Sequence, residues 1–173
     1  MNFEIERKFL VSGEEWRKLV TGRVTIRQAY LSSDGKASIR VRVTNGDKAT
    51  LTVKARPAEL GRLELEYPIP LAEAEALIEL RNGSIIEKTR FLVPCGDLTW
   101  EIDVFSGENA GLVIAEIELD HEHRKIELPA WLSEEVTARA EYYNSYLVQK
   151  PFGTWARNEN ETAERKPRLK SVR

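Results

Sequence analysis

Residues 3–11 read FEIERKFLV, and apolar and charged side chains alternate along this stretch. Successive side chains of a β-strand point to opposite faces, so alternation with a period of two predicts a strand. One face of this strand is apolar apart from Arg7, and the other carries Glu4, Glu6 and Lys8. A strand divided in this way predicts a sheet with one hydrophobic face and one charged face.

The same alternation recurs along most of the chain. Strands are predicted at residues 3–11, 24–32, 37–45, 48–56, 62–69, 84–94, 98–106 and 112–120. Asn45-Gly46-Asp47 separates two of them and is typical of a tight hairpin, which makes neighbouring strands antiparallel. Helices are predicted only at 12–20, 70–81 and, in one or two pieces, 129–148, which is too few for an alternating α/β fold. We therefore expect a mainly β (α+β) fold.

Length and composition limit the domain count and the classes of partner. The chain has 173 residues, of which 42% are hydrophobic and 31% charged, values typical of one globular domain. We expect this domain at residues 1–153, followed by a polar tail at 154–173. The formal charge of -2 disfavours a nucleic-acid or acidic-membrane partner, and no apolar run approaches the ~18–20 residues of a membrane span. The single cysteine, Cys95, fits a reducing cytoplasm.

Charges on the predicted strands are grouped by sign. Basic pairs include Arg40 with Arg42 and Lys88 with Arg90, and acidic pairs include Glu64 with Glu66, Glu101 with Asp103 and Glu116 with Glu118. These faces could be the solvated outside of a barrel, but a solvated sheet face gains from mixing opposite signs. Paired carboxylates suit a hard divalent cation, and Lys and Arg pairs suit several phosphate oxygens. The grouping favours charged faces turned inward around a polyanion and its metal.

Glu4-Ile5-Glu6-Arg7-Lys8 matches the E-x-E-x-K signature of the CYTH domains, also called triphosphate tunnel metalloenzymes. The resemblance extends over residues 2–120 as an ordered series of charged positions, and Tyr142 to Phe152 is similar to the family's C-terminal helix. That series comprises Arg40-x-Arg42, Lys54, Glu64-x-Glu66, Lys88-x-Arg90, Asp103 and Glu116-x-Glu118. The resemblance implies an eight-stranded antiparallel β-barrel tunnel with a charged interior, helices packed outside and a C-terminal helix.

The resemblance also implies an activity, a cofactor and a role for each residue. The activity is hydrolysis of the terminal phosphoanhydride of a linear triphosphate, a small-molecule substrate, with Mg²⁺ or Mn²⁺. The expected metal ligands are Glu4, Glu6, Glu116 and Glu118, with Glu64, Glu66 and Asp103 either binding a second metal or orienting basic residues. The expected phosphate-binding residues are Lys8, Arg40, Arg42, Lys54, Lys88 and Arg90. Tyr30 and Lys88 match a tyrosine–lysine pair proposed as the general base in some short tunnel enzymes.

Other activities remain open at this point. Some members of the family are class IV adenylate cyclases, others act on thiamine triphosphate or nucleoside triphosphates, and a non-catalytic polyphosphate-binding module would need the same charges. We favour inorganic triphosphate, because nothing beyond the tunnel charges provides for a nucleoside or thiamine. The sequence has no G-x-x-x-x-G-K-[ST] loop, which disfavours a P-loop nucleotidase.

Overall fold

The computed structural model describes residues 5–32, 37–55, 64–121 and 123–155. Nine strands form one antiparallel sheet in the order β5-β4-β3-β2-β6-β7-β8-β1-β9. Their bounds are β1 Ile5–Val11, β2 Gly22–Ser32, β3 Ala37–Thr44, β4 Lys48–Ala55, β5 Glu64–Ile69, β6 Ile86–Cys95, β7 Leu98–Ser106, β8 Val113–Leu119 and β9 Leu132–Glu135. Glu4 and nearly all of the expected tail at 154–173 lie outside the described residues.

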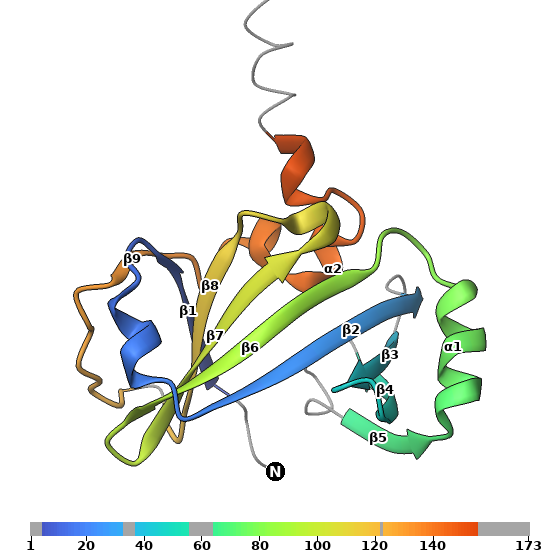
Figure 1. Cartoon of the computed structure of the whole chain (residues 1–173), viewed down its shortest axis with the longest axis horizontal. Coiled ribbons are helices and arrows are strands. Elements are labelled where there is room, and N and C mark those ends of the chain that lie inside the picture. The colour runs from blue at the N-terminus through green and yellow to red at the C-terminus, as the bar shows by residue number, and fades with distance from the viewer. Residues whose placement is uncertain (1–4, 33–36, 56–63, 122, 156–173) are drawn as a thin grey trace, which may run out of the picture.

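The sheet curls on itself, so that strands distant in the sheet order face each other (Figure 1). On one side lie β1, β8 and β7, on the other β3, β4 and β5, and the long strands β2 and β6 run between them. The mainly β antiparallel class is therefore confirmed. Within the described residues the structure differs from the expected closed eight-stranded barrel in two respects. The sheet has nine strands, and its edge strands β5 and β9 do not pair with each other.

The hairpin between β3 and β4 follows from its turn residues. Asn45 and Gly46 both have positive φ, 52° and 75°, and the backbone amide of Asp47 donates to the carbonyl of Thr44, so a tight turn joins the two strands. The hairpin aligns Arg42 with Thr50 and Arg40 with Thr52. The turn thus fixes which side chains of β3 and β4 share a face.

The convex face of the sheet is apolar and is covered by short helices. Helix α1 (Leu71–Glu79) buries Ala74 and Ile78 against Val41 and Val43. The 3₁₀ helix η1 (Glu15–Leu19) places Trp16 in a second cluster with Trp100. These two elements confirm the helices expected near 12–20 and 70–81 and their position outside the sheet. In the described residues no helix is long and apolar enough to cross a membrane.

The expectation of helix over 129–148, in one or two pieces, holds only for the second half of this segment. Strand β9 occupies its first part and pairs with β1, and two short helices follow, η4 (Ala140–Tyr142) and α2 (Asn144–Leu147). Leu147 and Val148 pack with Ile86, Phe105 and other side chains of the concave face. Unlike α1, this C-terminal segment therefore covers part of the inside of the curled sheet.

Candidate active site

The strand register turns the charged side chains to the concave face. Residues directly opposite each other on antiparallel strands lie on the same face. Glu6 of β1 is opposite Glu118 of β8, and Lys8 is opposite Glu116. The same face continues through the pairs Glu101 with Glu116, Arg90 with Asp103, Tyr30 with Arg40 and Lys54 with Glu64. The inward direction expected for the charged faces is therefore observed.

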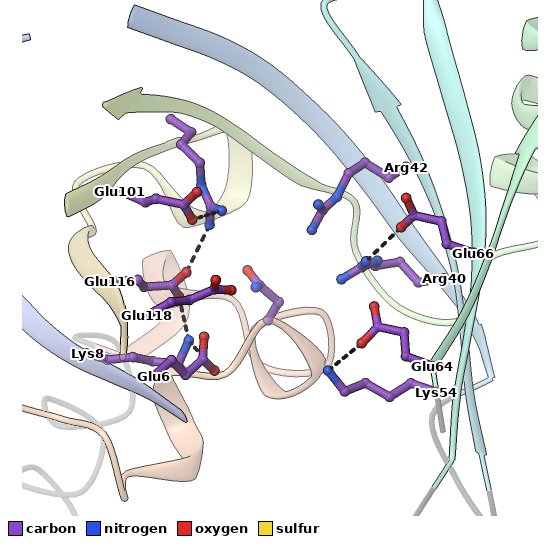
Figure 2. Close-up of a pocket in the computed structure, with 12 residues that line it drawn as sticks. Glu6, Lys8, Arg40, Arg42, Lys54, Glu64, Glu66, Glu101, Glu116 and Glu118 are labelled. Carbon is purple, nitrogen blue, oxygen red and sulfur yellow. Dashed lines mark hydrogen bonds and ion pairs between the residues drawn. The ribbon is translucent and has the colours of Figure 1, made fainter. Parts of the chain in front are cut away.

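These side chains line a cavity of about 250 Å³ between the two sides of the curled sheet (Figure 2). One side is formed by β1, β8, β7 and β6 and carries mostly carboxylates; we call this β1/β8/β7/β6 wall the acidic wall. The other side, the β3/β4/β5 wall, carries Arg40, Arg42 and Lys54 together with two carboxylates. The lining comprises Glu6, Lys8, Arg40, Arg42, Lys54, Glu64, Glu66, Arg90, Glu101, Glu116, Glu118 and Asn144. Such a lining suits a highly charged ligand rather than an apolar one.

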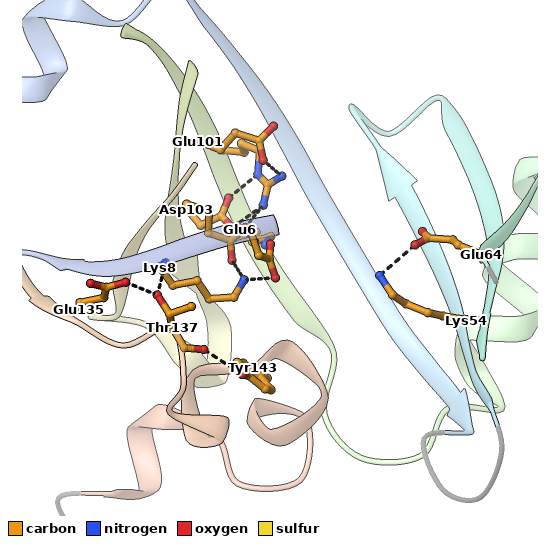
Figure 3. Close-up of polar contacts among 12 residues, drawn as sticks. Glu6, Lys8, Lys54, Glu64, Glu101, Asp103, Glu135, Thr137 and Tyr143 are labelled. Atoms are coloured by element: carbon orange, nitrogen blue, oxygen red, sulfur yellow. Dashed lines mark hydrogen bonds and ion pairs between the residues drawn. The ribbon is translucent and has the colours of Figure 1, made fainter. Parts of the chain in front are cut away.

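Lys8 connects two carboxylates of the acidic wall. Its Nζ lies 2.6 Å from Glu116 Oε1 and 3.0 Å from Glu6 Oε1 (Figure 3). Burial would lower the pKa of the Lys8 ammonium, but Glu116 and Glu6 outweigh burial and raise it. Lys8 is therefore a permanent cation within the acidic wall.

Glu6 and Glu118 are like charges directly opposite each other, an arrangement that destabilises a sheet unless a cation lies between them. Carboxylate oxygens are the ligands that Mg²⁺ and Mn²⁺ prefer, so the chemistry of these residues fits such a metal. Within the described ranges, no group of three or more acidic, histidine or cysteine side chains is arranged as a metal site. Lys8 forms ion pairs with Glu6 and Glu116, and Glu4 is not among the residues that the structure describes.

Arg90 is the centre of a buried ion-pair network. It makes two hydrogen bonds to Asp103, of 2.7 and 2.8 Å, and one of 2.9 Å to Glu116, and it also pairs with Glu101. Behind it, Lys88 pairs with Asp103, and both side chains are completely buried. Burial would raise the pKa of Asp103, but Lys88 and Arg90 together lower it to about 2. Asp103 therefore contacts two basic residues at once.

The basic residues of the β3/β4/β5 wall make fewer contacts with carboxylates than Arg90 does. Arg40 Nη2 donates to Thr52 Oγ1 at 3.2 Å, and Thr52 Oγ1 donates to Glu66 Oε2 at 3.1 Å. Arg40 itself lies 4.0 Å from Glu66, and Lys54 lies 2.9 Å from Glu64. Glu64 and Glu66 thus contact basic residues across the wall.

Arg42 has a neutral partner. Its Nε donates to Gln28 Oε1 at 3.0 Å, and within the described part of the chain no carboxylate lies in ion-pair distance of it. Burial, Arg40 and Arg90 together lower the pKa of Arg42 to about 10. The cavity therefore contains one arginine whose positive charge is crowded by other cations and not balanced by an adjacent anion.

The proposed Tyr30–Lys88 pair is only partly assembled. Burial and Arg90 lower the pKa of the Lys88 ammonium, although Asp103 opposes them, and a lowered pKa is what a lysine base needs. Tyr30, however, packs in the apolar cluster with Ile86 and Phe105, and the residue opposite Lys88 on β2 is Ile26. The hydrogen-bonding partner observed for Lys88 is Asp103.

Sequence reasoning missed four residues of the site. Glu101 was assigned to a charged strand but given no role, and it lines the cavity and pairs with Arg90. Gln28, Thr52 and Asn144 carry no charge and so gave no signal in a search for charged pairs. Asn144 lines the cavity from the start of α2, and its buried Oδ1 has no hydrogen-bond partner in the described part of the chain.

The C-terminal segment is tied to the charged strand β1. The backbone amide of Lys8 donates to Thr137 Oγ1 at 3.0 Å, and Thr137 Oγ1 donates to Glu135 Oε1 at 2.7 Å (Figure 3). Tyr143 Oη donates to the carbonyl of Thr137 at 2.9 Å. These bonds explain how Asn144, which follows Tyr143, is held beside the cavity.

Comparison with known families and proteins agrees with this geometry. The profile of the CYTH domain matches residues 2–150. An inorganic triphosphatase of Acetivibrio thermocellus is 47% identical over 153 residues, covering 88% of this chain and 97% of that protein. An inorganic triphosphatase of Nitrosomonas europaea is 36% identical over 150 residues, covering 84% of this chain and 96% of that protein.

The fold has a solved counterpart. The crystal structure of an inorganic triphosphatase superimposes with a TM-score of 0.66 at 31% identity, covering 86% of this chain and 95% of that chain. Both the sequence match and the structural match extend well beyond the charged strands into the C-terminal segment.

Proposed function

The chain belongs to the CYTH domain family, and from that premise we propose that it hydrolyses inorganic tripolyphosphate to pyrophosphate and phosphate with the help of a divalent cation. The observation that carries the proposal is the cavity itself, in which carboxylates on one wall face basic side chains on the other. A triphosphate needs both, because its oxygens bind cationic side chains and metal together. The single free cysteine is consistent with the cytoplasmic location that we include in the proposal.

The metal would be Mg²⁺ or Mn²⁺, held by Glu6, Glu116 and Glu118, with Glu4 as a fourth ligand from outside the described residues. When bound, such a metal polarises phosphate oxygens and offsets the charge that develops on them. Both Glu6 and Glu116 would have to share or release Lys8 for this role, because Lys8 Nζ lies 3.0 Å from Glu6 and 2.6 Å from Glu116. Glu64, Glu66 and Asp103 orient basic residues in this proposal and remain candidates for a second metal.

The phosphates would be bound by Lys8, Arg40, Arg42, Lys54 and Arg90, all of which line the cavity. Arginine offers a planar fork to two phosphate oxygens, whereas lysine offers a compact charge. Lys88 lies behind this lining and would act on the phosphates through Arg90 and Asp103 unless it serves as the base. Holding the chain of phosphates in line with the attacking water supplies much of the catalysis in phosphoryl transfer.

The lining residues favour an inorganic substrate. Apart from Asn144, every described lining side chain is charged, and none is aromatic or aliphatic. Recognition of a nucleoside or thiamine would call for an apolar surface against the ring. We therefore place tripolyphosphate ahead of ATP and thiamine triphosphate.

A metal-dependent phosphate-release panel with tripolyphosphate, ATP, thiamine triphosphate and pyrophosphate tests this function. We expect tripolyphosphate to be cleaved fastest, and cleavage to stop when the metal is chelated. Glu6→Gln, which keeps size and removes charge, is expected to reduce metal-dependent release at least about a hundredfold with the fold intact. The matched control is Glu79→Gln, on the solvent side of α1, which should leave the rate unchanged.

Three results would contradict the proposal. Formation of cyclic AMP from ATP would identify a cyclase, and tight binding of tripolyphosphate without phosphate release would identify a binding module. Near-normal activity of Glu6→Gln would mean that the carboxylates of the β1/β8/β7/β6 wall do not bind the metal.

We further propose that Lys88 accepts the proton of the attacking water and that Tyr30, which packs in the apolar cluster of the concave face, orients Lys88 when substrate is bound. A base must be deprotonated to act, so activity should fall on the acidic side of a pH–rate profile as Lys88 becomes protonated. Tyr30→Phe is expected to shift or abolish this acidic limb, measured as kcat against pH at saturating metal. An unchanged limb with only a raised KM would leave Lys88 as part of the phosphate-binding machinery, and the base would then be sought elsewhere.

A further inference from the structure

Gln28 is a completely buried polar side chain in the middle of the charged face. It lies on β2 opposite Arg42 of β3 on one side and Ile86 of β6 on the other. Its Oε1 accepts the hydrogen bond from Arg42 Nε, while its Nε2 is buried and has no hydrogen-bond partner among the residues that the structure describes. A buried amide with one half unsatisfied lowers stability, so this position calls for an explanation beyond packing.

The partner of Arg42 differs in kind from the partners of Arg90. Three carboxylates surround Arg90, whereas Arg42 meets only the neutral carbonyl oxygen of Gln28 among the residues that the structure describes. A guanidinium already paired with a carboxylate must share or lose that partner when a phosphate arrives. A guanidinium held by an amide is oriented without losing its charge.

We propose that Gln28 is a positioning residue that orients the Arg42 guanidinium toward the substrate and, being neutral, keeps its charge available for a phosphate group. The hydrogen bond uses Nε, and the guanidinium points into the space between the two walls (Figure 2). The two Nη groups are then directed at the cavity, where a planar fork can bind two oxygens of one phosphate. This inference rests on the proposed function, because it concerns binding of the same triphosphate.

This arrangement costs stability in the protein without substrate. Arg42 is half-buried close to Arg40 and Arg90, and burial together with repulsion from these two arginines lowers its pKa. A carboxylate at position 28 would pair with Arg42 and offset this repulsion. The two properties should therefore change in opposite directions: Gln28→Glu is expected to stabilise the empty protein and to weaken binding of a polyanion.

The experiment compares Gln28→Glu with Gln149→Glu, an exposed glutamine whose replacement adds the same charge outside the cavity. The melting temperature is measured without ligand, and the Kd for tripolyphosphate is measured by calorimetry in EDTA, where turnover is prevented. We expect Gln28→Glu to raise the melting temperature and to raise the Kd at least about tenfold. With Mg²⁺ present, KM should rise while kcat changes by less than about threefold, because the lost interaction serves binding. Gln149→Glu should change none of these quantities.

Gln28→Met gives an independent test, since it keeps the length of the side chain but has neither acceptor nor charge. We expect it to raise the Kd by less than Gln28→Glu does and to leave the melting temperature below that of Gln28→Glu. The inference is overturned if Gln28→Glu melts below the wild type, if it binds tripolyphosphate as tightly as the wild type, or if Gln28→Met binds unchanged. Failure of the proposed function would be visible separately, as a wild-type protein that neither binds nor cleaves tripolyphosphate.

Discussion

At the scale of single residues, the pair formed by Lys88 and Asp103 lies behind the cavity lining and holds it in place. Neither side chain is exposed, and Asp103 also makes the two hydrogen bonds that hold Arg90. Removing one member of a buried ion pair leaves the other charged and unpaired, which is strongly destabilising. Asp103 therefore links the position of a cavity-lining arginine to the stability of the fold.

The lowered pKa of Asp103 predicts how stability depends on acid. In the folded protein its pKa is about 2, below the ordinary value of 3.8, so the stabilisation is present above pH 4 and is lost as pH falls toward 2. We expect the free energy of unfolding, measured by urea titration, to decrease through this window. Asp103→Asn should be less stable at neutral pH and should lose less stability between pH 4 and 2. An equal decrease in both proteins would assign the acid sensitivity to other carboxylates.

At the scale of elements, the position of β1 decides the shape of the acidic wall. It lies between β8 and β9, and its register with β8 brings Glu6 and Lys8 to Glu118 and Glu116. On its other side Arg7, the one charged residue on the apolar face, pairs with Glu135 of β9 at 2.6 Å. Arg7, the exception in the alternating pattern, thus has its ion-pair partner on a strand that follows more than a hundred residues later.

The same neighbourhood explains where prediction from sequence succeeded and where it failed. The long strands were predictable because their alternation is strong, and the inward charges followed from it. Strand β9 was not, because Leu132–Glu135 is short and is extended only by pairing with the edge of β1, a long-range contact that overrides local helix propensity. Gln28 and Asn144 were not predicted as site residues, because a neutral amide gives a signal only when its burial and its hydrogen-bond partners among the described residues are known.

The C-terminal segment is anchored by Leu147 on the concave face. This side chain is completely buried in the cluster that contains Ile86, Phe105 and Val136. Leu147→Ala is expected to lower the free energy of unfolding by about 2–5 kcal/mol, because it removes buried apolar contacts and leaves a cavity. Leu80→Ala is the control, since Leu80 is 71% exposed and should cost less than about 0.5 kcal/mol. Both values come from urea unfolding, and a loss at Leu147 as small as that at Leu80 would mean that the segment does not anchor here.

At the scale of the whole molecule, the curled sheet concentrates charge of both signs in one cavity and keeps the apolar face outside under η1 and α1. Ligand that binds only the folded state raises its stability by mass action. We expect tripolyphosphate with Mg²⁺, at about a hundred times its Kd, to raise the melting temperature by roughly 5–10 °C. The measurement is a thermal melt, with sodium chloride of equal ionic strength as the control. If the two salts gave the same melting temperature, the cavity would not be a triphosphate site.

The position of β1 also has a consequence for synthesis of the protein. Its two neighbours in the sheet, β8 and β9, follow much later in the sequence, and the contacts that fix β1 include Lys8 with Glu116 and Arg7 with Glu135, 108 and 128 positions apart. A nascent chain can form the consecutive hairpins of β2 to β5 as they leave the ribosome, but β1 must wait until β8 and β9 have been translated. Glu6 and Lys8 meet Glu116 and Glu118 only at that last step. The β1/β8/β7/β6 wall is therefore assembled only after β8 and β9 have been translated, and a shorter nascent chain cannot bring its carboxylates together.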